Sequence, residues 1–441
     1  MRPSPAVLVL SVVVVALVFG LVGVRERART DLGAKAHHTD FTVYTAAAKA
    51  LADGADPYDA RSPRGWRYVY PPLLAIVFRP LTWLSDPNGA FVWYVVSFLA
   101  LAYALVETAR AIGGRAGRTA VAAAFLVCLL FVGQTFQRGQ VTTILLALQV
   151  GALVALARRR DVLAGVVLAL GVALRLTPLL PAGVVGIACL RRLLGGEGRA
   201  ALRFPLGFVA GLVLWFAVVP AALLGPARAV EVTKRWLEVG REVYASAPGA
   251  LADLSGDYGV KEHVYKNQGV RRVAGTWSGW VSCAPFTGER PELGDGWASV
   301  DRFAFAVAAL VGVFALVTGW RRFRAPTDAG TRLAYAAACL APVLVTRYAW
   351  PVHYAVAIPF LAEAFASPRR SAARLGFYVF AAGTIFFALG YLGAADVLRL
   401  PARAGVLAIA TVTAIVLALG LRHVASLGGL PRAADAPDGG T

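Results

Sequence analysis

The chain has 441 residues, of which 58% are hydrophobic and 16% are charged. A soluble globular domain carries about 25% charged residues, so this composition excludes that class and indicates an integral membrane protein. The formal net charge of +19 suggests a nucleic-acid partner at first sight, but the arginines occur in short runs between apolar segments, such as RRR at 158–160 and RRFR at 321–324. This is the positive-inside pattern of membrane topology, and it explains the charge without nucleic acid.

The four cysteines give no sign of a disulfide framework or a CxxC metal site. Cys128, Cys189 and Cys339 lie in apolar segments, and Cys283 lies in a polar one. Redox chemistry is therefore not expected, and no metal site is predicted. The first apolar run, residues 6–24, lacks a nearby A-x-A-type cleavage site, so we interpret it as a retained anchor.

Apolar runs long enough to cross a bilayer, or nearly so, recur along the chain and predict an all-α polytopic membrane protein of about twelve helices. Several are shorter than the ~20 residues of a full span, as is typical of helices that line a cavity or a thinned region. The runs are 6–24, 88–109, 119–133, 140–157, 162–174, 177–190, 204–224, 302–319, 333–347, 352–366, 375–392 and 403–420.

The distribution of Lys and Arg predicts the orientation. Alternating passage through the membrane places 20 of the 44 basic residues in the tails and short loops on the side of both termini, and five in the short loops opposite. Both termini are therefore expected in the cytoplasm. The long segments 25–87 and 225–302 then lie outside it as two outer-face loops. Arg25, Arg27 and Arg29 violate this rule because they follow the first span directly on the outer side.

The segment YPPLLAIVFRPLTWL, residues 70–84, resembles a span but carries Arg79 and Pro80 at its centre. A charge there is costly at bilayer depth and tolerable at the interface. We predict a juxtamembrane helix here and another at 41–53. Residues 1–430 are thus expected to form one transmembrane domain, and the Ala/Gly/Pro-rich residues 431–441 a disordered tail.

Polar side chains gather at the expected outer ends of the apolar helices, whereas no Walker motif, GxGxxG turn, HExxH or nucleophile elbow occurs. Each polar group near bilayer depth is a candidate site residue. Ordinary roles remain open: Asp40 could cap a helix, Arg175 could extend to the surface, and His353 could be an interior histidine. The candidates are Asp40, Arg138, Gln140, Arg175, Asn267, Gln268, Arg347 and His353.

Six elements in this order resemble glycosyltransferase family 87, a group of polytopic GT-C fold enzymes. They are DFTVYTAAAKALADGADPYD, YPPLLAIVFRPLTWL, GQVTTILLAL, RLTPLLP, NQ and YAWPVHY. The resemblance covers residues 38 to about 366. The chain departs from the family at Thr142, where Asn is more frequent, at Arg175, where Lys is frequent, and at Gly269, where Ser is usual.

The resemblance implies a membrane glycosyltransferase that moves a sugar, mannose or another hexose, from a polyprenyl-phosphate donor to a glycolipid or glycan acceptor. Transfer would proceed with inversion at the extracytoplasmic face, with no cofactor and no metal. Asp40 would be the general base, and His353 would orient it or share its proton. Donor-phosphate contacts are expected from Arg175, Arg138, Gln140 and Arg347, and substrate contacts from Tyr44, Tyr70, Asn267 and Gln268. The three arginines 25, 27 and 29 are expected to serve the same anionic lipid.

Two other classes are compatible with the sequence. A lipid or glycolipid transporter also uses many helices and a broken segment such as RLTP. It has no evident use for a carboxylate on an outer helix, and the sequence contains no inverted repeat. A structural membrane scaffold leaves the polar candidates unexplained.

Overall fold

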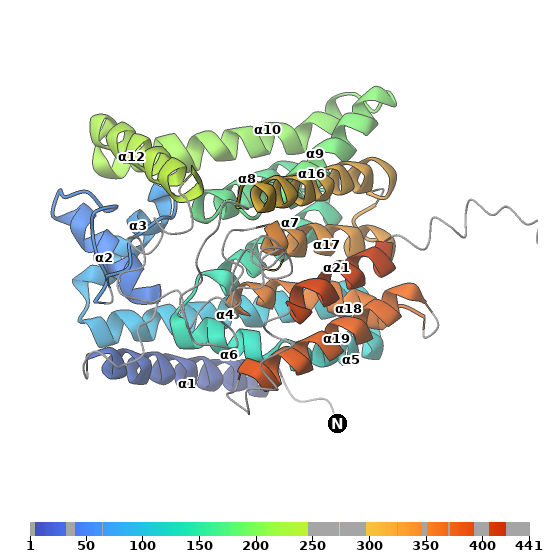
Figure 1. Cartoon of the computed structure of the whole chain (residues 1–441), viewed down its shortest axis with the longest axis horizontal. Coiled ribbons are helices and arrows are strands. Elements are labelled where there is room, and N and C mark those ends of the chain that lie inside the picture. The colour runs from blue at the N-terminus through green and yellow to red at the C-terminus, as the bar shows by residue number, and fades with distance from the viewer. Residues whose placement is uncertain are drawn as a thin grey trace, which may run out of the picture.

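The fold consists of helices, most of which run roughly parallel to the long axis of the molecule (Figure 1). The structure is a computed structural model and describes residues 5–31, 40–63, 65–245, 273, 297–323, 325–345, 351–368, 371–391 and 405–419. Within these ranges there is no strand, and one isolated bridge joins Arg61 and Arg67. The all-α prediction is confirmed for this part of the chain.

The longest helices include α1 (Pro5–Asp31), α4 (Asp86–Ile112) and α19 (Ala372–Tyr391). A further long helix is formed by α10 (Arg199–Val213), which continues through the π-helical turn η2 (Leu214–Val218) into α11 (Val219–Leu224). The others along the bundle are α5 (Gly114–Val127), α6 (Leu129–Arg138), α7 (Thr142–Ala157), α8 (Asp161–Leu174), α9 (Leu179–Leu194), α16 (Trp297–Arg321), α17 (Ala329–Val345), η4 (Pro351–Ala357), α18 (Ile358–Ala366) and α21 (Val406–Leu419).

The predicted number of spans is not confirmed, although helices occupy all twelve predicted ranges. Among the described residues, four helices are long and apolar enough to cross a membrane. The pair α5 and α6 makes a fifth if it counts as one span with a bend of 63°. Seven shorter apolar helices complete the set. At 1.5 Å rise per residue, the 16 residues of α7 extend only ~24 Å, short of a ~30 Å hydrocarbon core.

Apolar side chains on the outside of the bundle fit a lipid environment. Leu10 and Leu21 of α1 are 63% and 62% exposed. Inside the bundle, α8 and α10 approach closely because small residues face each other. A Cβ on Gly207 would lie 2.3 Å from the Val162 carbonyl oxygen. This small-residue packing is typical of helices associating in membranes, where close backbone approach replaces hydrophobic burial.

Three further helices gather at one end of the bundle, at the left of Figure 1. They are α2 (Asp40–Ala52), α3 (Pro72–Phe78), which continues into the 3₁₀ turn η1 (Arg79–Trp83), and the amphipathic α12 (Pro226–Ala245). Helices predicted at 41–53 and within 70–84 are therefore present. Their position along a membrane interface stays a prediction. Beyond α12 and Val273, the second predicted outer loop lies outside the described residues up to residue 296, as does the predicted tail at 431–441.

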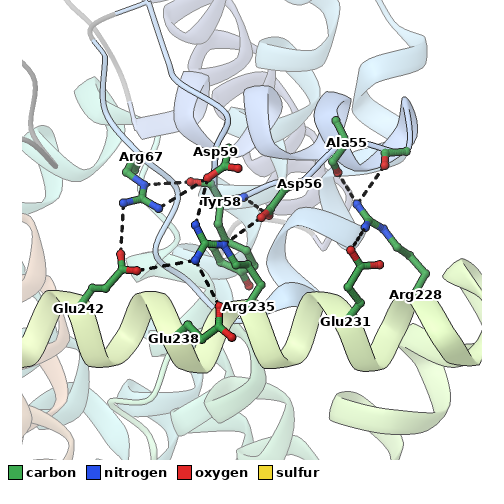
Figure 2. Close-up of polar contacts among 11 residues, drawn as sticks. Ala55, Asp56, Tyr58, Asp59, Arg67, Arg228, Glu231, Arg235, Glu238 and Glu242 are labelled. Carbon is green, nitrogen blue, oxygen red and sulfur yellow. Dashed lines mark hydrogen bonds and ion pairs between the residues drawn. The ribbon is translucent and has the colours of Figure 1, made fainter.

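Ion pairs hold the loop between α2 and α3 against α12 (Figure 2). Arg235 of α12 contacts Asp56 at 3.0 Å and Asp59 at 3.2 Å, and Glu242 contacts Arg67 at 3.5 Å. Arg228 donates to the carbonyl oxygen of Ala55 at 2.6 Å. A single exposed pair contributes little, but pairs that share partners fix one another's geometry. The network ties two segments far apart in the sequence.

One of the three arginines that violate the positive-inside rule has a structural partner. Arg27 forms an ion pair with Asp86, in the first turn of α4. Neutralisation by an acidic neighbour gives Arg27 a role in joining α1 to α4, and no lipid phosphate is needed to explain it.

Cysteines placed at opposite ends of the bundle should react with a labelling reagent from opposite sides of the membrane. The background for the test is Cys283→Ser, in which the three remaining cysteines are buried. In this background we expect Ala52→Cys to react with an impermeant maleimide in intact cells. Glu197→Cys, in the exposed turn between α9 and α10, should react only after permeabilisation. Labelling of both variants in intact cells would contradict the predicted topology.

Candidate functional site

A buried carboxylate and a side-chain amide meet at the end of the bundle where α2 lies. Asp40 is the first residue of α2 and is 7% exposed, and Gln140 lies between α6 and α7 and is 4% exposed. The Gln140 Nε2 donates a hydrogen bond to Asp40 Oδ2. The Gln140 Oε1 accepts one from the Tyr44 hydroxyl at 3.1 Å. Both ends of the amide are thus used, which fixes its orientation and points Asp40 at the α6–α7 turn.

The turn before Gln140 requires glycine. Gly139 ends α6 in the left-handed region, with φ +66°, and a Cβ there would lie 2.7 Å from the Cβ of Phe41. Its carbonyl oxygen accepts a 2.9 Å hydrogen bond from the indole of Trp93. Only glycine combines this backbone conformation with so close a neighbour. Gly139 and Gln140 therefore let α2 pack closely against the turn between α6 and α7.

Two buried tyrosines extend the site from Asp40. The rings of Tyr44 and Tyr70 meet edge to face with centroids 5.3 Å apart. Burial raises the pKa of Tyr44 well above its usual value, and the neighbouring Tyr70 and Asp40 act in the same direction. Burial likewise raises the pKa of Tyr70, against an opposing effect of Arg175. Both phenols therefore stay neutral at physiological pH and can donate hydrogen bonds.

Arg175 and His353 form the other half of the site. Arg175 ends α8 with extended backbone, and its guanidinium carbon lies 5.8 Å from the centroid of the Tyr70 ring, within cation–π range. Its Nη2 lies 2.8 Å from His353 Nε2 and 3.5 Å from Nδ1. A guanidinium only donates, so in this contact the imidazole nitrogen is the acceptor. His353 is held in η4 and is 6% exposed.

The YPP segment is anchored by two tyrosines that are completely buried. The Tyr58 hydroxyl donates to the Tyr70 carbonyl oxygen at 3.1 Å. The Tyr68 hydroxyl donates to the Pro71 carbonyl oxygen at 2.6 Å and accepts from the Ala75 amide at 3.0 Å. These bonds fix the backbone at Tyr70 and just after it, and the Tyr70 ring contacts both Tyr44 and Arg175.

Two buried hydroxyls follow Gln140 closely in the chain. Thr142 and Thr143 begin α7, are 2% and 0% exposed, and within the described part of the chain their Oγ1 atoms have no hydrogen-bond partner. A buried hydroxyl without a partner is unfavourable unless something binds it. Both can donate to, or accept from, a polyhydroxyl ligand.

The structure thus brings together six of the predicted residues: Asp40, Tyr44, Tyr70, Gln140, Arg175 and His353. Arg138 lies at the end of α6, half-buried, one residue before Gly139. Three predicted residues, Asn267, Gln268 and Arg347, lie outside the described residues, so their place in the site stays a prediction. Across the described ranges, no group of three or more His, Cys, Asp or Glu side chains could hold a metal ion. Independence of a metal likewise stays a prediction.

Several functional positions were not identified from the sequence. Gly139, Tyr58 and Tyr68 position the predicted residues, and Arg235 with Asp56 closes the loop that carries Tyr58. The tyrosines repeat within DPYD and YVYPP, and this clustering of large amphipathic rings near prolines was an available signal. The pairing of Arg235 with Asp56 joins residues 179 positions apart, and no local pattern indicates it.

Comparison with known proteins gives one family match and one curated relative. The family model for glycosyltransferase family 87 matches residues 68–346, which includes Tyr70, Gln140 and Arg175 but neither Asp40 nor His353. A polyprenol-phosphate-mannose-dependent alpha-(1-2)-phosphatidylinositol mannoside mannosyltransferase of Mycobacterium tuberculosis is 27% identical over 206 residues. That alignment covers 41% of this chain and 45% of the relative. No solved structure matches the chain.

Gly139→Ala should destabilise the protein and disturb the site together. Placing a non-glycine residue in the left-handed backbone region costs roughly 1–2 kcal/mol. The added methyl group would also push Phe41, and with it Asp40, away from Gln140. We expect a lower melting temperature in detergent. The matched control is Gly133→Ala on the same helix, where a Cβ meets nothing within 4 Å and helix propensity favours alanine by up to ~1 kcal/mol. Equal melting temperatures for the two variants would contradict the role of Gly139.

Proposed function

Because the chain belongs to glycosyltransferase family 87, we propose that it transfers a sugar from a polyprenyl-phosphate donor to a hydroxyl of a glycolipid or glycan acceptor, at the extracytoplasmic face. The relative named above uses a polyprenol-phosphate-mannose donor and a phosphatidylinositol mannoside acceptor. Mannose is accordingly the sugar we propose. The matched part of that relative is less than half of its length, so donor, acceptor and sidedness are part of the proposal.

One observation carries this proposal: a continuous set of contacts joins the carboxylate of Asp40 to the guanidinium of Arg175. The contacts pass through Gln140, Tyr44 and Tyr70. Glycosyl transfer with inversion needs a proton acceptor near the acceptor hydroxyl and a cation near the leaving phosphate. The carboxylate of Asp40 and the guanidinium of Arg175 are the charged groups that we propose for these two roles.

In the proposed reaction, the acceptor hydroxyl oxygen attacks the anomeric carbon of the donor sugar. Asp40 takes the proton of that hydroxyl as the new glycosidic bond forms. The bond between the anomeric carbon and the phosphate oxygen breaks, and polyprenyl phosphate leaves with the electron pair. Arg175 stabilises the charge on the leaving phosphate through charge-assisted hydrogen bonds. The phosphate leaves as an anion, so no general acid is needed.

The other residues would serve binding and positioning. His353 accepts a hydrogen bond from Arg175, so we assign it to holding the guanidinium in place, in preference to sharing the proton of Asp40. Thr142, Thr143 and Tyr44 offer hydroxyls to the sugar. A neutral, buried set of hydroxyl groups suits a sugar because each sugar hydroxyl both donates and accepts.

A reconstituted assay tests the proposal against transport. Proteoliposomes containing labelled polyprenyl-phosphate mannose and a phosphatidylinositol mannoside acceptor should yield labelled acceptor. Movement of the intact donor between leaflets, without a labelled product, would support a transporter and contradict the proposal.

Asp40→Asn tests the general base. Asn keeps an oxygen that accepts from Gln140 and starts a helix about as well as Asp, but it takes no proton at neutral pH. We expect a melting temperature near that of the wild type and a transfer rate lower by at least ~10²-fold. Near-normal transfer by this variant would leave Asp40 with only a capping role. The base would then be sought among acidic residues such as Asp257 or Glu262.

Arg175→Ala tests the donor-phosphate contact. Loss of a hydrogen bond to a charged group costs about 1.5–3 kcal/mol, equivalent to a rise in the donor KM of roughly 10- to 150-fold. Arg175→Lys keeps the charge without the planar fork and should fall between the wild type and the alanine variant. An unchanged donor KM in Arg175→Ala would show that the arginine only packs against Tyr70 and His353.

A further inference from the structure

A cavity of about 260 Å³ lies within the bundle, away from the site described above. Its walls come from α4, α7, α17 and α18, and its rim includes the exposed residues Arg110, Ala157 and Thr327. Helix α7 begins beside Gln140 and ends at Ala157, so ~24 Å of helix separates the candidate site from this rim. The cavity thus opens at the opposite end of the bundle.

The charged groups on the cavity wall are already paired. Arg332 binds both carboxylate oxygens of Glu363, at 2.5 and 3.2 Å, and Arg110 contacts Glu107 at 2.5 Å. A charged ligand would have to break one of these pairs or be buried without a partner, and both are unfavourable. The cavity therefore suits an uncharged ligand.

Most of the remaining wall is apolar, and its uncharged polar members are Thr108, Gln149, Thr327 and Tyr335. Leu146, Val150 and Leu153 from α7 face Ala336 and Cys339 from α17 across the cavity. Gln149 of α7 lines the cavity and is 2% exposed, and within the described residues its Oε1 has no hydrogen-bond partner. A carbonyl oxygen only accepts, so a ligand must bring a donor to it. A lipid amine would be protonated at neutral pH and would meet the same cost as any other charged ligand. The donor is therefore a neutral group, and in neutral bilayer lipids the common neutral donor is a hydroxyl.

We propose that this cavity binds a neutral lipid that carries a free hydroxyl, such as a long-chain alcohol or a diacylglycerol. The hydroxyl donates to Gln149 Oε1, and the hydrocarbon lies against the apolar wall. The volume equals that of about nine water molecules at ~30 Å³ each, enough for the hydroxyl end and part of one chain. The rest of the lipid extends past the rim to the bilayer.

Photolabelling of the full chain in nanodiscs tests this site. The probe is dodecan-1-ol with a diazirine near the middle of its chain, and the control probe is the same diazirine-bearing dodecane without the hydroxyl. Mass spectrometry should place the alcohol label on the peptides that line the cavity. Excess dodecan-1-ol should suppress that label, whereas label on the lipid-facing side of α10 should not saturate.

The variant Gln149→Leu removes the acceptor and leaves an apolar side chain of similar size. Cavity labelling by the alcohol should fall roughly 3- to 10-fold, as expected for the loss of one hydrogen bond, with labelling by the hydrocarbon unchanged. Competition in the wild-type protein keeps the test valid if this variant folds poorly. Equal labelling by both probes, labelling that excess alcohol does not suppress, or an unlabelled cavity would each overturn the proposal.

Discussion

The hydrogen bond from the Gln140 amide to the Asp40 carboxylate is the contact on which the candidate site depends. It joins residues 100 positions apart, and it holds the start of α2 against the turn between α6 and α7. A carboxylate buried here would be costly without a partner, and the amide supplies one while remaining neutral. The same amide accepts from Tyr44, so the orientation of Asp40 and the position of the first tyrosine are set together. Gly139 makes this possible because a side chain at that position would displace Phe41.

A second requirement is that the cation lie close to the carboxylate without pairing with it. A direct ion pair between Arg175 and Asp40 would tie up both the proposed base and the proposed phosphate-binding group. The contacts between them pass through two aromatic rings, and Arg175 instead contacts His353. The tyrosines at 58 and 68 hold the YPP backbone, and the ion pairs between the α2–α3 loop and α12 hold that segment in turn. Residues outside the candidate site thereby help to fix the positions of the two charges.

The sequence predicted the helices that carry these residues because its signals are local. The helical pattern after Asp40, the YPP segment with its central arginine, and the polar residues at the ends of apolar runs each identified a structured position. Their assembly could not be predicted from such patterns. The contact of Gln140 with Asp40 and that of Arg175 with His353 depend on tertiary packing. The predicted number of spans is not confirmed because helices such as α7 and α8 are apolar but too short for length alone to identify them as spans.

The most direct test of this account is a structure of the protein with a non-transferable polyprenyl-phosphate mannose analogue. The account predicts the donor phosphate within hydrogen-bond distance of the Arg175 guanidinium. It also predicts the anomeric carbon on the side of Asp40, with the sugar hydroxyls toward Thr142 and Thr143. A donor bound elsewhere in the bundle, with Asp40 and Arg175 still joined through Gln140 and the tyrosines, would contradict it.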